Sequence, residues 1–398
     1  MYMVDIWPFF GTRPNNQDAK TLIAPSTDHL SIENIETFKK NNYWNYLKIL
    51  NPVGQLKEED SLLEARNHFK EMKENDVIKK DNELHFYIYE IKLGNHTQLG
   101  FLSLASIKDF ERNIIKAHEK IYESRKIERA DQMMNLNTQI GPIYVSYQSE
   151  KIIRDLLLSK IDNQPSYDFE SFDKSIHKLW CVNDIEFIKK LKKLMQNIDS
   201  IYIADGHHRM GALQFINKKN PQNEKFMIAA FPSNEAKIFD YNRVIKDLNG
   251  LTKDEFIKVL SKYFKVEKKD SPYKPNKRNE FGMYHEGQWF FLEFIKSVDQ
   301  SNFIDSLDIN ILNNFCLTKI LNIKDVNNDK RIRFIAGCHG LNALEKKVDE
   351  NPDSVAFSIF PSEITDVIKV ADNNLTMPPK STWFDPKPLD GLVVYEFE

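Results

Sequence analysis

Five consecutive residues in the middle of the sequence, DGHHR at positions 205–209, combine an acid, a glycine, two imidazoles and a guanidinium. They follow the apolar segment Ile201–Ala204, which favours a short buried strand, and they open a segment with helical character that runs through Ile216. The first N–H groups of a helix have no partner within it and lie at the positive end of its dipole. The sequence therefore predicts a strand that turns into an anion-binding helix start.

Each residue of this pentapeptide has its own chemical use. Gly206 lets the backbone approach a ligand closely, and Arg209 can donate two parallel hydrogen bonds to a phosphate. His207 and His208 can donate or shuttle protons, and Asp205 can hold Mg²⁺ or an ammonium group. The alternative is that Asp205 caps the helix and that the two histidines are surface residues.

A second set of candidate residues lies earlier, where Lys116, His118 and Glu119 precede Arg125 and Arg129. A carboxylate flanked by an imidazole and by basic groups can serve as a general base, and its cationic neighbours attract phosphates. Charged stretches of this kind are more often the solvated face of a helix. Both interpretations remain open at this point.

The segment at positions 377–384, MPPKSTWF, is the third candidate. Two prolines restrict the backbone ahead of Lys380, Ser381 and Thr382, so an ammonium and two hydroxyls are presented beside two aromatic rings. Such a loop suits contacts with a phosphate or a carboxylate. It could equally be a strap whose aromatic rings fill the core.

Four weaker candidates are polar residues near turns or strand ends: Arg13, the pair Asp28–His29, the pair Asn242–Arg243, and His339. Such residues more often have structural than catalytic roles. The sequence contains no GxxxxGK[ST], GxGxxG or HExxH motif, so a nucleotide would have to bind by another route.

Charge and composition narrow the class of protein. The chain has 398 residues, 41% of them apolar, which is enough for a sizeable core and for two or three domains. Its 55 Lys and Arg residues are balanced by 58 Asp and Glu residues, giving a net charge of −3. Proteins that coat DNA or RNA carry a basic excess, so we expect no nucleic-acid partner.

The three cysteines, Cys181, Cys316 and Cys338, are scattered and form no CxxC pair. The sequence also shows no secretory apolar region and no apolar run as long as a membrane span. These features predict a cytoplasmic protein with no membrane partner. They leave open whether it is a monomer or a homodimer.

Hydrophobic periodicity and turn signals predict the elements that position the candidate residues. The runs Leu84–Leu93 and Gln98–Leu104, joined by Gly94-Asn95, predict a hairpin. Apolar residues at helical spacing predict a helix over Lys57–Glu74, and further along the chain buried strands alternate with amphipathic helices. The sequence therefore predicts an α+β (mixed α/β) fold in three parts: an N-terminal domain at 1–108, a catalytic core at 109–250 and a C-terminal domain at 251–398.

Eight segments along the chain form a recognisable series. They are PFFGTRP (8–14), IKAHE (115–119), GPIYVSY (141–147), HKLW (177–180), IYIADGHHR (201–209), DINIL (308–312), MPPKSTWFDPK (377–387) and LDGLVVYEF (389–397). Together they resemble the domain-of-unknown-function 1015 family, in the family's order and over essentially the whole chain. The sequence departs from the family pattern at Met210–Gly211, where an aromatic residue and an acid are common, and at APSTD (24–28), where Pro-Tyr-Asp is usual.

The order of HE, a Gly-Pro-Ile strand and DGHHR also resembles the ParB/sulfiredoxin-like superfamily, with an insertion between the last two motifs. Members of that superfamily hold nucleotide phosphates on a DGxHR-type turn. The resemblance therefore implies a nucleotide-binding core of this kind, flanked by α/β N- and C-terminal regions. Free serine kinases within the superfamily carry HE and DGHHR together and use the glutamate to activate the serine hydroxyl.

This resemblance implies a free L-serine kinase that transfers a phosphoryl group from ATP or ADP, with Mg²⁺, to give O-phospho-L-serine. It makes Glu119 the general base, Asp205 a second essential acid and Mg²⁺ ligand, and His207 a further catalytic residue. The expected phosphate-binding residues are Lys116, His118, Gly206, His207, His208 and Arg209. The candidates for binding the serine carboxylate and ammonium are Arg125, Arg129, Lys380, Ser381 and Thr382.

Other functions compete with this prediction. A ParB-like protein that binds or hydrolyses nucleotides, with a regulatory or DNA-associated role, would use the same turn, but the acidic net charge and the lack of a clear helix-turn-helix segment argue against it. A different small-molecule kinase or a phosphatase is also compatible with the motif. A sulfiredoxin-like reductase is the least favoured, because no cysteine lies beside DGHHR.

Overall fold

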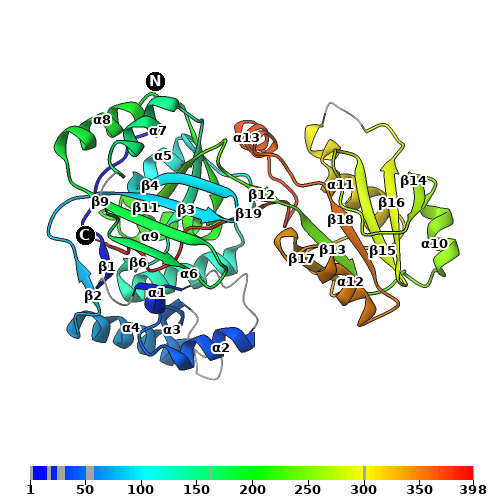
Figure 1. Cartoon of the computed structure of the whole chain (residues 1–398), viewed down its shortest axis with the longest axis horizontal. Coiled ribbons are helices and arrows are strands. Elements are labelled where there is room, and N and C mark those ends of the chain that lie inside the picture. Colours follow the sequence, from blue (N-terminus) through cyan, green and yellow to red (C-terminus); the bar gives the residue numbers. More distant parts are fainter. Residues whose placement is uncertain are drawn as a thin grey trace. The chain divides into compact units, whose positions relative to one another are not determined.

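The chain folds into two units that are interleaved in sequence (Figure 1). A computed structural model describes residues 3–15, 19–24, 32–50, 58–161, 164–298 and 302–397. The first unit contains Met1–Ala117, Ile121–Ala236 and Pro386–Glu398, and the second contains His118–Lys120 and Lys237–Asp385. In sequence, the second unit is therefore mostly an insertion between two parts of the first.

The first unit is built on an eight-stranded mixed sheet in the order β5-β10-β7-β11-β4-β3-β9-β8. Neighbouring strands are antiparallel, except that β5 with β10 and β7 with β11 are parallel pairs. The hairpin predicted around Gly94-Asn95 is confirmed as β3–β4. The strands are β3 (Phe86–Leu93), β4 (His96–Ser106), β5 (Ile115–Lys116), β7 (Ile143–Tyr147), β8 (Tyr167–Glu170), β9 (Ile176–Val182), β10 (Ile201–Asp205) and β11 (Lys225–Pro232).

The central strands of this sheet are buried beneath helices and loops, and their largely apolar sequences suit that position. Every residue of β7 is buried, and so is every residue of β11 after Lys225, as expected of strands that are covered on both faces. Among the helices, α6 packs against α9, and Figure 1 shows α2, α3 and α4 gathered at one end of the unit. The helices are α1 (Ala19–Leu22), α2 (Ile32–Asn41), α3 (Leu47–Leu50), α4 (Glu58–Glu74), α5 (Ile107–Glu111), α6 (Glu123–Leu136), α7 (Lys151–Leu158), α8 (Ile185–Met195) and α9 (His207–Lys219).

Two short antiparallel pairs complete the first unit. β1 (Thr12–Pro14) pairs with β2 (Ile78–Lys80), and β6 (Thr138–Gln139) pairs with β20 (Tyr395–Glu396). The β6–β20 pair joins the segment that follows residue 385 to the first unit.

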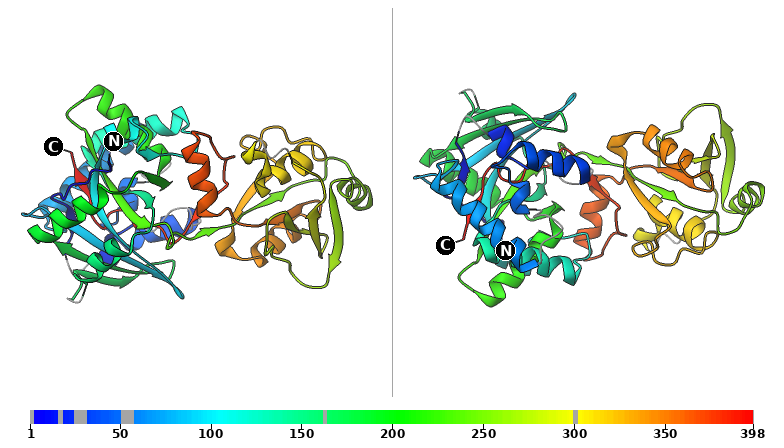
Figure 2. Two further views of the ribbon diagram at one scale, coloured as in Figure 1. Left: turned by 90° about the horizontal axis from the view of Figure 1, so that it is seen from above. Right: turned by 90° about the horizontal axis from the view of Figure 1, so that it is seen from below.

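The second unit is a six-stranded antiparallel sheet in the order β14-β16-β15-β18-β13-β17. One face packs with α10 and α11 and the other with α12, so α11 and α12 lie on opposite sides of the sheet (Figure 2). A short pair, β12 (Ile238–Phe239) with β19 (Trp383–Phe384), joins the beginning and the end of this unit. The remaining elements are β13 (Tyr241–Ile245), α10 (Lys253–Leu260), β14 (Phe264–Lys269), β15 (Glu280–His285), β16 (Gln288–Phe294), α11 (Asp308–Leu312), β17 (Ile332–Ala336), α12 (Asn342–Asp349), β18 (Val355–Ile359) and α13 (Ile364–Asp372).

The predicted mixed α/β class is confirmed, but the two units differ from the three predicted domains. β4 ends before residue 108 and pairs with β11, which begins at Lys225, so hydrogen bonds cross the first predicted boundary. Likewise β13 and β14, on either side of residue 250, belong to one sheet. Composition marks local segments along the chain, whereas pairing between distant strands decides which segments share a unit.

Two features of the sequence lie outside the described residues. They are the weak candidate pair Asp28–His29 and the part of the APSTD segment that follows Ala24.

Candidate phosphate-binding site

The predicted strand-to-helix turn is present at the end of β10. Asp205 is the last residue of the strand, Gly206 is the N-cap of α9 and His207 is the first helical residue. Gly206 has φ of +99°, a left-handed conformation that residues with a side chain rarely adopt. The N-cap is thus Gly206 rather than Asp205, and the Asp205 carboxylate stands one residue ahead of a helix start whose N–H groups suit an anion.

Asp205 is ionised and already has a cationic partner. Its Oδ1 atom lies 3.0 Å from Nζ of Lys387, and its side chain is 42% exposed whereas that of Lys387 is 11% exposed. Although burial acts to raise it, the charges of Lys387 and Arg209 hold the pKa of Asp205 below its usual value. The carboxylate can therefore accept hydrogen bonds or ligate a cation at neutral pH.

Arg209 joins three segments of the first unit. It donates one hydrogen bond to the carbonyl of Pro142 (2.9 Å) and another to Oδ2 of Asp390 (2.8 Å). A Cβ atom on Gly141 would lie 1.8 Å from Oδ1 of Asp390 and 2.4 Å from the guanidinium, so only glycine fits there. The GPIYVSY, DGHHR and LDGLVVYEF segments thus meet at this guanidinium, which orients it without a bound ligand.

The two histidines of the motif lie in different environments. His207 is 4% exposed, and burial lowers its pKa to about 4 against the opposing effect of the Asp205 charge. It is therefore neutral at pH 7 and can meet a phosphate only as a hydrogen-bond donor, not as a cation. His208 packs beside Tyr122, whose backbone N–H donates to Nδ1 (3.4 Å).

Helix α6 brings a second guanidinium towards the turn. Arg129 is half-buried, and burial together with the positive charge of Arg209 lowers its pKa. The guanidinium groups of Arg129 and Arg209 therefore repel each other, and an anion near them would reduce this repulsion. The side chain donates to Gln132 Oε1 (3.1 Å), whereas Arg125, one helical turn earlier, is exposed.

Lys116 and Gly211 shape the surroundings of the turn. Lys116 lies on β5 directly beside Tyr202 of β10, and its ammonium lies 5.9 Å from the centre of that ring. A Cβ on Gly211 would lie 2.6 Å from Ile121, so the departure from the family pattern at this position lets α9 pack closely against the segment that precedes α6.

The second unit brings the HE motif and the MPPKST loop together. Nε2 of His118 lies 3.3 Å from the Thr382 hydroxyl, and the His118 carbonyl accepts a hydrogen bond from the Met377 N–H (2.8 Å). His118 is fully buried and also packs beside Phe384, whereas Glu119 is half-buried. His118 and Thr382, which are 264 positions apart in the sequence, are therefore neighbours in this unit.

The MPPKST loop is held in shape by hydrogen bonds from its own unit. Ser381 donates its hydroxyl proton to the Pro378 carbonyl (2.5 Å), so its proton is already used to hold the loop. Lys380 is exposed, has a left-handed φ of +57° and accepts a hydrogen bond from Arg243 at its carbonyl (2.9 Å). Lys380 and Thr382 thus remain the side chains of this loop that suit a ligand.

Three of the weaker candidates have structural surroundings. Arg13, a residue of β1, pairs with Asp81 (2.8 Å), and His339 belongs to a short 3₁₀ turn, Gly337–His339. Arg243 is fully buried, burial lowers its pKa to about 9, and its guanidinium donates to backbone carbonyls of the MPPKST loop. Arg243 therefore acts on the loop rather than on solvent.

Two residues of the site were missed in the sequence analysis, namely Lys387 and Asp390. They lie 182 and 181 positions from their partners Asp205 and Arg209. Their only signal was membership of the MPPKSTWFDPK and LDGLVVYEF segments, which carried the family resemblance without an assigned role.

The residues near the turn suit a metal ion that is shared with a ligand. Among the described residues, no three His, Cys, Asp or Glu side chains are grouped closely enough to hold a metal ion by themselves. Asp205 supplies one carboxylate, with Lys387 on one of its oxygens. One carboxylate is enough for Mg²⁺ when phosphates and waters provide the other ligands, so the donor set fits that mode of binding.

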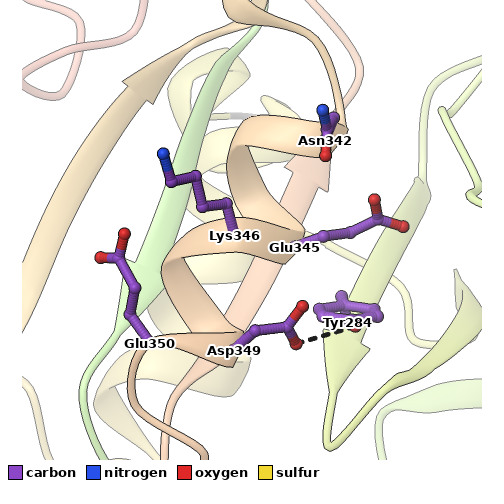
Figure 3. Close-up of a pocket in the computed structure, with 6 residues that line it drawn as sticks. All are labelled: Tyr284, Asn342, Glu345, Lys346, Asp349 and Glu350. Carbon is purple, nitrogen blue, oxygen red and sulfur yellow. Dashed lines mark hydrogen bonds between the residues drawn. The ribbon is translucent and has the colours of Figure 1, made fainter.

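Two pockets, one in each unit, lie apart from these motifs. In the second unit a pocket of about 620 Å³ lies between Tyr284 and helix α12, where the Tyr284 hydroxyl donates to Asp349 (3.0 Å; Figure 3). In the first unit a pocket of about 580 Å³ lies along α4, the end of α6 and Glu396. Neither is lined by a DGHHR or HE residue. In the parts of the chain that the structure covers, no helix has the length and apolar character needed to cross a bilayer.

Fold and site together define a mixed α/β protein with a strand–helix turn that is a candidate anion site. A family model described as protein of unknown function (DUF1015) matches residues 6–310, and the chain therefore belongs to the DUF1015 family. No curated protein is significantly similar to the chain in sequence.

Three solved structures match part of the chain at low sequence identity. C-terminally truncated SbnI from Staphylococcus aureus is 10% identical, with a TM-score of 0.39 over 71% of this chain and 82% of its own. A free serine kinase in complex with AMP is 14% identical, with a TM-score of 0.37 over 73% of this chain and 92% of its own. A conserved hypothetical protein from Pyrococcus furiosus is 12% identical, with a TM-score of 0.35 over 71% and 90%. These values define no activity for the chain.

Proposed function

We propose that this protein is a nucleotide-dependent phosphotransferase, and specifically a free L-serine kinase that uses ATP or ADP as the phosphoryl donor. The observation that carries the proposal is the β10–α9 turn, where the ionised Asp205, the helix start at Gly206 and the guanidinium of Arg209 lie within five residues. The identity of the acceptor rests on the pairing of HE and DGHHR motifs in one sequence.

In the proposed reaction the turn holds the nucleotide phosphates. Phosphoryl transfer depends mainly on positioning and on neutralising charge, because the reacting phosphorus needs no covalent help from the protein. The N–H groups at the start of α9 and the side chains of His207 and His208 donate hydrogen bonds to phosphate oxygens. Arg209 and Arg129 supply the positive field, with Lys116 as a further cation on β5.

Mg²⁺, when bound, would neutralise charge on the phosphates, and Asp205 is the residue that would hold it. Glu119 accepts the proton of the serine hydroxyl as the serine oxygen bonds to the terminal phosphorus. The bond from that phosphorus to the bridging oxygen breaks, and its electron pair leaves with ADP or AMP. Arg125 or Arg129, with Lys380 and Thr382, are the proposed contacts of the serine carboxylate and ammonium, and the Ser381 hydroxyl is proposed to hold the loop that presents them.

A direct assay tests this proposal. The purified protein is incubated with ATP or ADP, Mg²⁺ and a panel of hydroxy amino acids, and products are read by ³¹P NMR and mass spectrometry. We expect O-phosphoserine from serine alone. A phosphorylated product from another acceptor would overturn serine specificity, nucleotide hydrolysis without transfer would favour a ParB-like hydrolase, and absence of nucleotide binding would remove the phosphotransferase.

A matched pair of variants tests the base. Glu119→Gln keeps the shape of the side chain but cannot accept a proton, so we expect kcat to fall by about 100-fold or more while the nucleotide Kd stays unchanged. Glu123→Gln, which alters an exposed carboxylate in the first turn of α6, should leave both values unchanged. Full activity in Glu119→Gln would exclude this residue as the base.

A further inference from the structure

A chain of hydrogen bonds lies within the sheet of the first unit, apart from the DGHHR turn. It begins at Asp173, in the loop between β8 and β9, and passes through Ser175 and His177 to Tyr89 of β3. Ser175 Oγ contacts Asp173 Oδ1 and lies 2.6 Å from His177 Nε2, and the Tyr89 hydroxyl lies 2.7 Å from His177 Nδ1. Ser175 and His177 are fully buried, and Tyr89 is 1% exposed.

Only one direction of proton donation satisfies this chain. The Asp173 carboxylate can only accept, so the Ser175 hydroxyl donates to it and must accept from Nε2–H of His177. Nδ1 of His177 then carries no proton and accepts from the Tyr89 hydroxyl. Burial lowers the pKa of His177 to about 4, which keeps the imidazole neutral at neutral pH, and its two hydrogen-bond partners set the tautomer.

The far end of the chain is attached to the segment that follows residue 385. The Tyr89 oxygen, having donated its proton to His177, accepts the backbone N–H of Leu389 (3.3 Å). Gln98 of β4 donates to the Pro386 carbonyl (3.0 Å). Two neighbouring strands of the sheet thus hold the backbone of residues 386–389 through buried side chains.

The same short segment provides both partners of the DGHHR turn. Lys387 pairs with Asp205 and Asp390 with Arg209, at 3.0 and 2.8 Å. The attachment at Leu389 lies between these two side chains in sequence. The position of both ion pairs therefore depends on where Tyr89 holds the backbone.

We infer that Asp173, Ser175, His177 and Tyr89 form a positioning network for the phosphate-binding turn, acting through Lys387 and Asp390. The inference rests on the proposed function for its effect on nucleotide binding, but not for its effect on the turn itself. A network of polar side chains, three of them buried and Asp173 half-buried, costs free energy unless every member is satisfied, whereas apolar side chains would fill the same space without that cost. A role in fixing the positions of Lys387 and Asp390 would explain why the network is present.

The test compares two variants that each remove one buried hydroxyl from the same sheet. Tyr89→Phe removes the acceptor of Leu389 and the donor to His177. Tyr147→Phe, at a buried position of β7 outside the network, is the matched control. Hydrogen exchange of the full-length protein is followed by mass spectrometry in peptides covering 386–391 and 205–210, and nucleotide KM and kcat are measured in parallel.

We expect faster exchange in both peptides of Tyr89→Phe and not of Tyr147→Phe. Because a single hydrogen bond is worth about 0.5–1.5 kcal/mol, the nucleotide KM should rise about 2- to 10-fold, with a smaller change in kcat. General destabilisation would instead lower the active fraction, and thus kcat, without raising KM.

Unchanged exchange at 205–210 in Tyr89→Phe, or equal acceleration in Tyr147→Phe, would overturn the inference. The exchange measurement needs no ligand. If the wild-type protein binds no nucleotide, the proposed function fails while the exchange result still decides whether the network positions the turn.

Discussion

At the scale of single residues, the turn carries a negative charge where a phosphate is proposed to bind. Asp205 alone would repel an anion, but Lys387, Arg209 and Arg129 lie around it, and Asp390 is the second acid of this group. Three cations against two carboxylates leave a net positive charge at the helix start. Asp205 can therefore bind a cation or accept a hydrogen bond without preventing a phosphate from binding nearby.

The buried imidazole of His207 makes stability depend on pH. The unfolded chain binds a proton at the ordinary histidine pKa of 6.5, whereas the folded protein binds it only at about 4. The unfolded state thus gains a proton first as the pH falls, and stability decreases between pH 6.5 and 4, by about 3 kcal/mol if His207 is fully neutral in the fold. In urea unfolding, we expect His207→Gln to lose less stability than the wild type between pH 7 and pH 5.

His208→Gln is the matched comparison, since it removes the adjacent imidazole. It should retain the pH dependence of the wild type in the same experiment. An equal loss of stability in His207→Gln and in the wild type would mean that His207 is protonated in the folded protein at pH 5.

At the scale of elements, the β10–α9 turn depends on the backbone of Gly206. A side chain at φ of +99° is strained, so Gly206→Ala should destabilise the protein by about 1–2 kcal/mol. Because relief of the strain would move the first N–H groups of α9, we also expect a weaker nucleotide Kd. Isothermal titration calorimetry and urea unfolding measure the two effects.

The variant Gly250→Ala distinguishes the effect of backbone strain from the effect of Gly206's position at the start of α9. Gly250 also has a positive φ, +78°, and has open space around its Cβ position, but it lies in a loop of the second unit. The Gly250→Ala substitution should lower the free energy of unfolding by a similar amount and leave nucleotide affinity unchanged. Weaker binding in both variants would show that the loss follows from stability alone.

The elements themselves were largely predictable from sequence because their signals are local. Gly94-Asn95 fixed the β3–β4 hairpin, the apolar run before Asp205 identified β10, and helical spacing identified α4 within one residue of its start. Helical spacing alone predicts a helix from Thr252 to Phe264, but α10 ends at Leu260 because Phe264 begins β14 opposite Phe294. Propensity could not anticipate that distant pairing.

The candidate site was predictable only where its residues are neighbours in sequence. The turn from Asp205 to Arg209 is present as predicted, but no local pattern connects it with Lys387 or Asp390. It also could not show that the Ser381 hydroxyl is used within its own loop or that burial keeps His207 neutral. Those properties depend on tertiary contacts, which periodicity does not encode.

At the scale of the whole molecule, the second unit begins and ends at adjacent points. β12 pairs with β19, and the Asp385 N–H donates to the Lys237 carbonyl (3.1 Å). The incoming and outgoing segments of this unit are therefore neighbours, and a short linker from Ala236 to Pro386 would bridge the gap left by its removal. The residues of the phosphate-binding turn and their partners all remain in the first unit.

A variant that replaces residues 237–385 with a short Gly-Ser linker should therefore fold and bind nucleotide with the affinity of the full chain. It should not phosphorylate serine, because Lys380 and Thr382 are absent and His118 has lost its partners. Circular dichroism, calorimetry and the product assay measure these properties. Loss of nucleotide binding in a folded variant would contradict the assignment of the phosphate site to the first unit alone.

The separation of Asp205 from Lys387 in the sequence also affects when the turn is completed during synthesis. During synthesis the ribosome makes the DGHHR turn first and must then make the whole of Lys237–Asp385 before either ion-pair partner exists. At about 5–20 residues per second, the nascent chain spends on the order of ten seconds with an incomplete turn. The second unit is synthesised in full within that interval, while the first unit still lacks the segment that pairs with β6 and supplies Lys387 and Asp390.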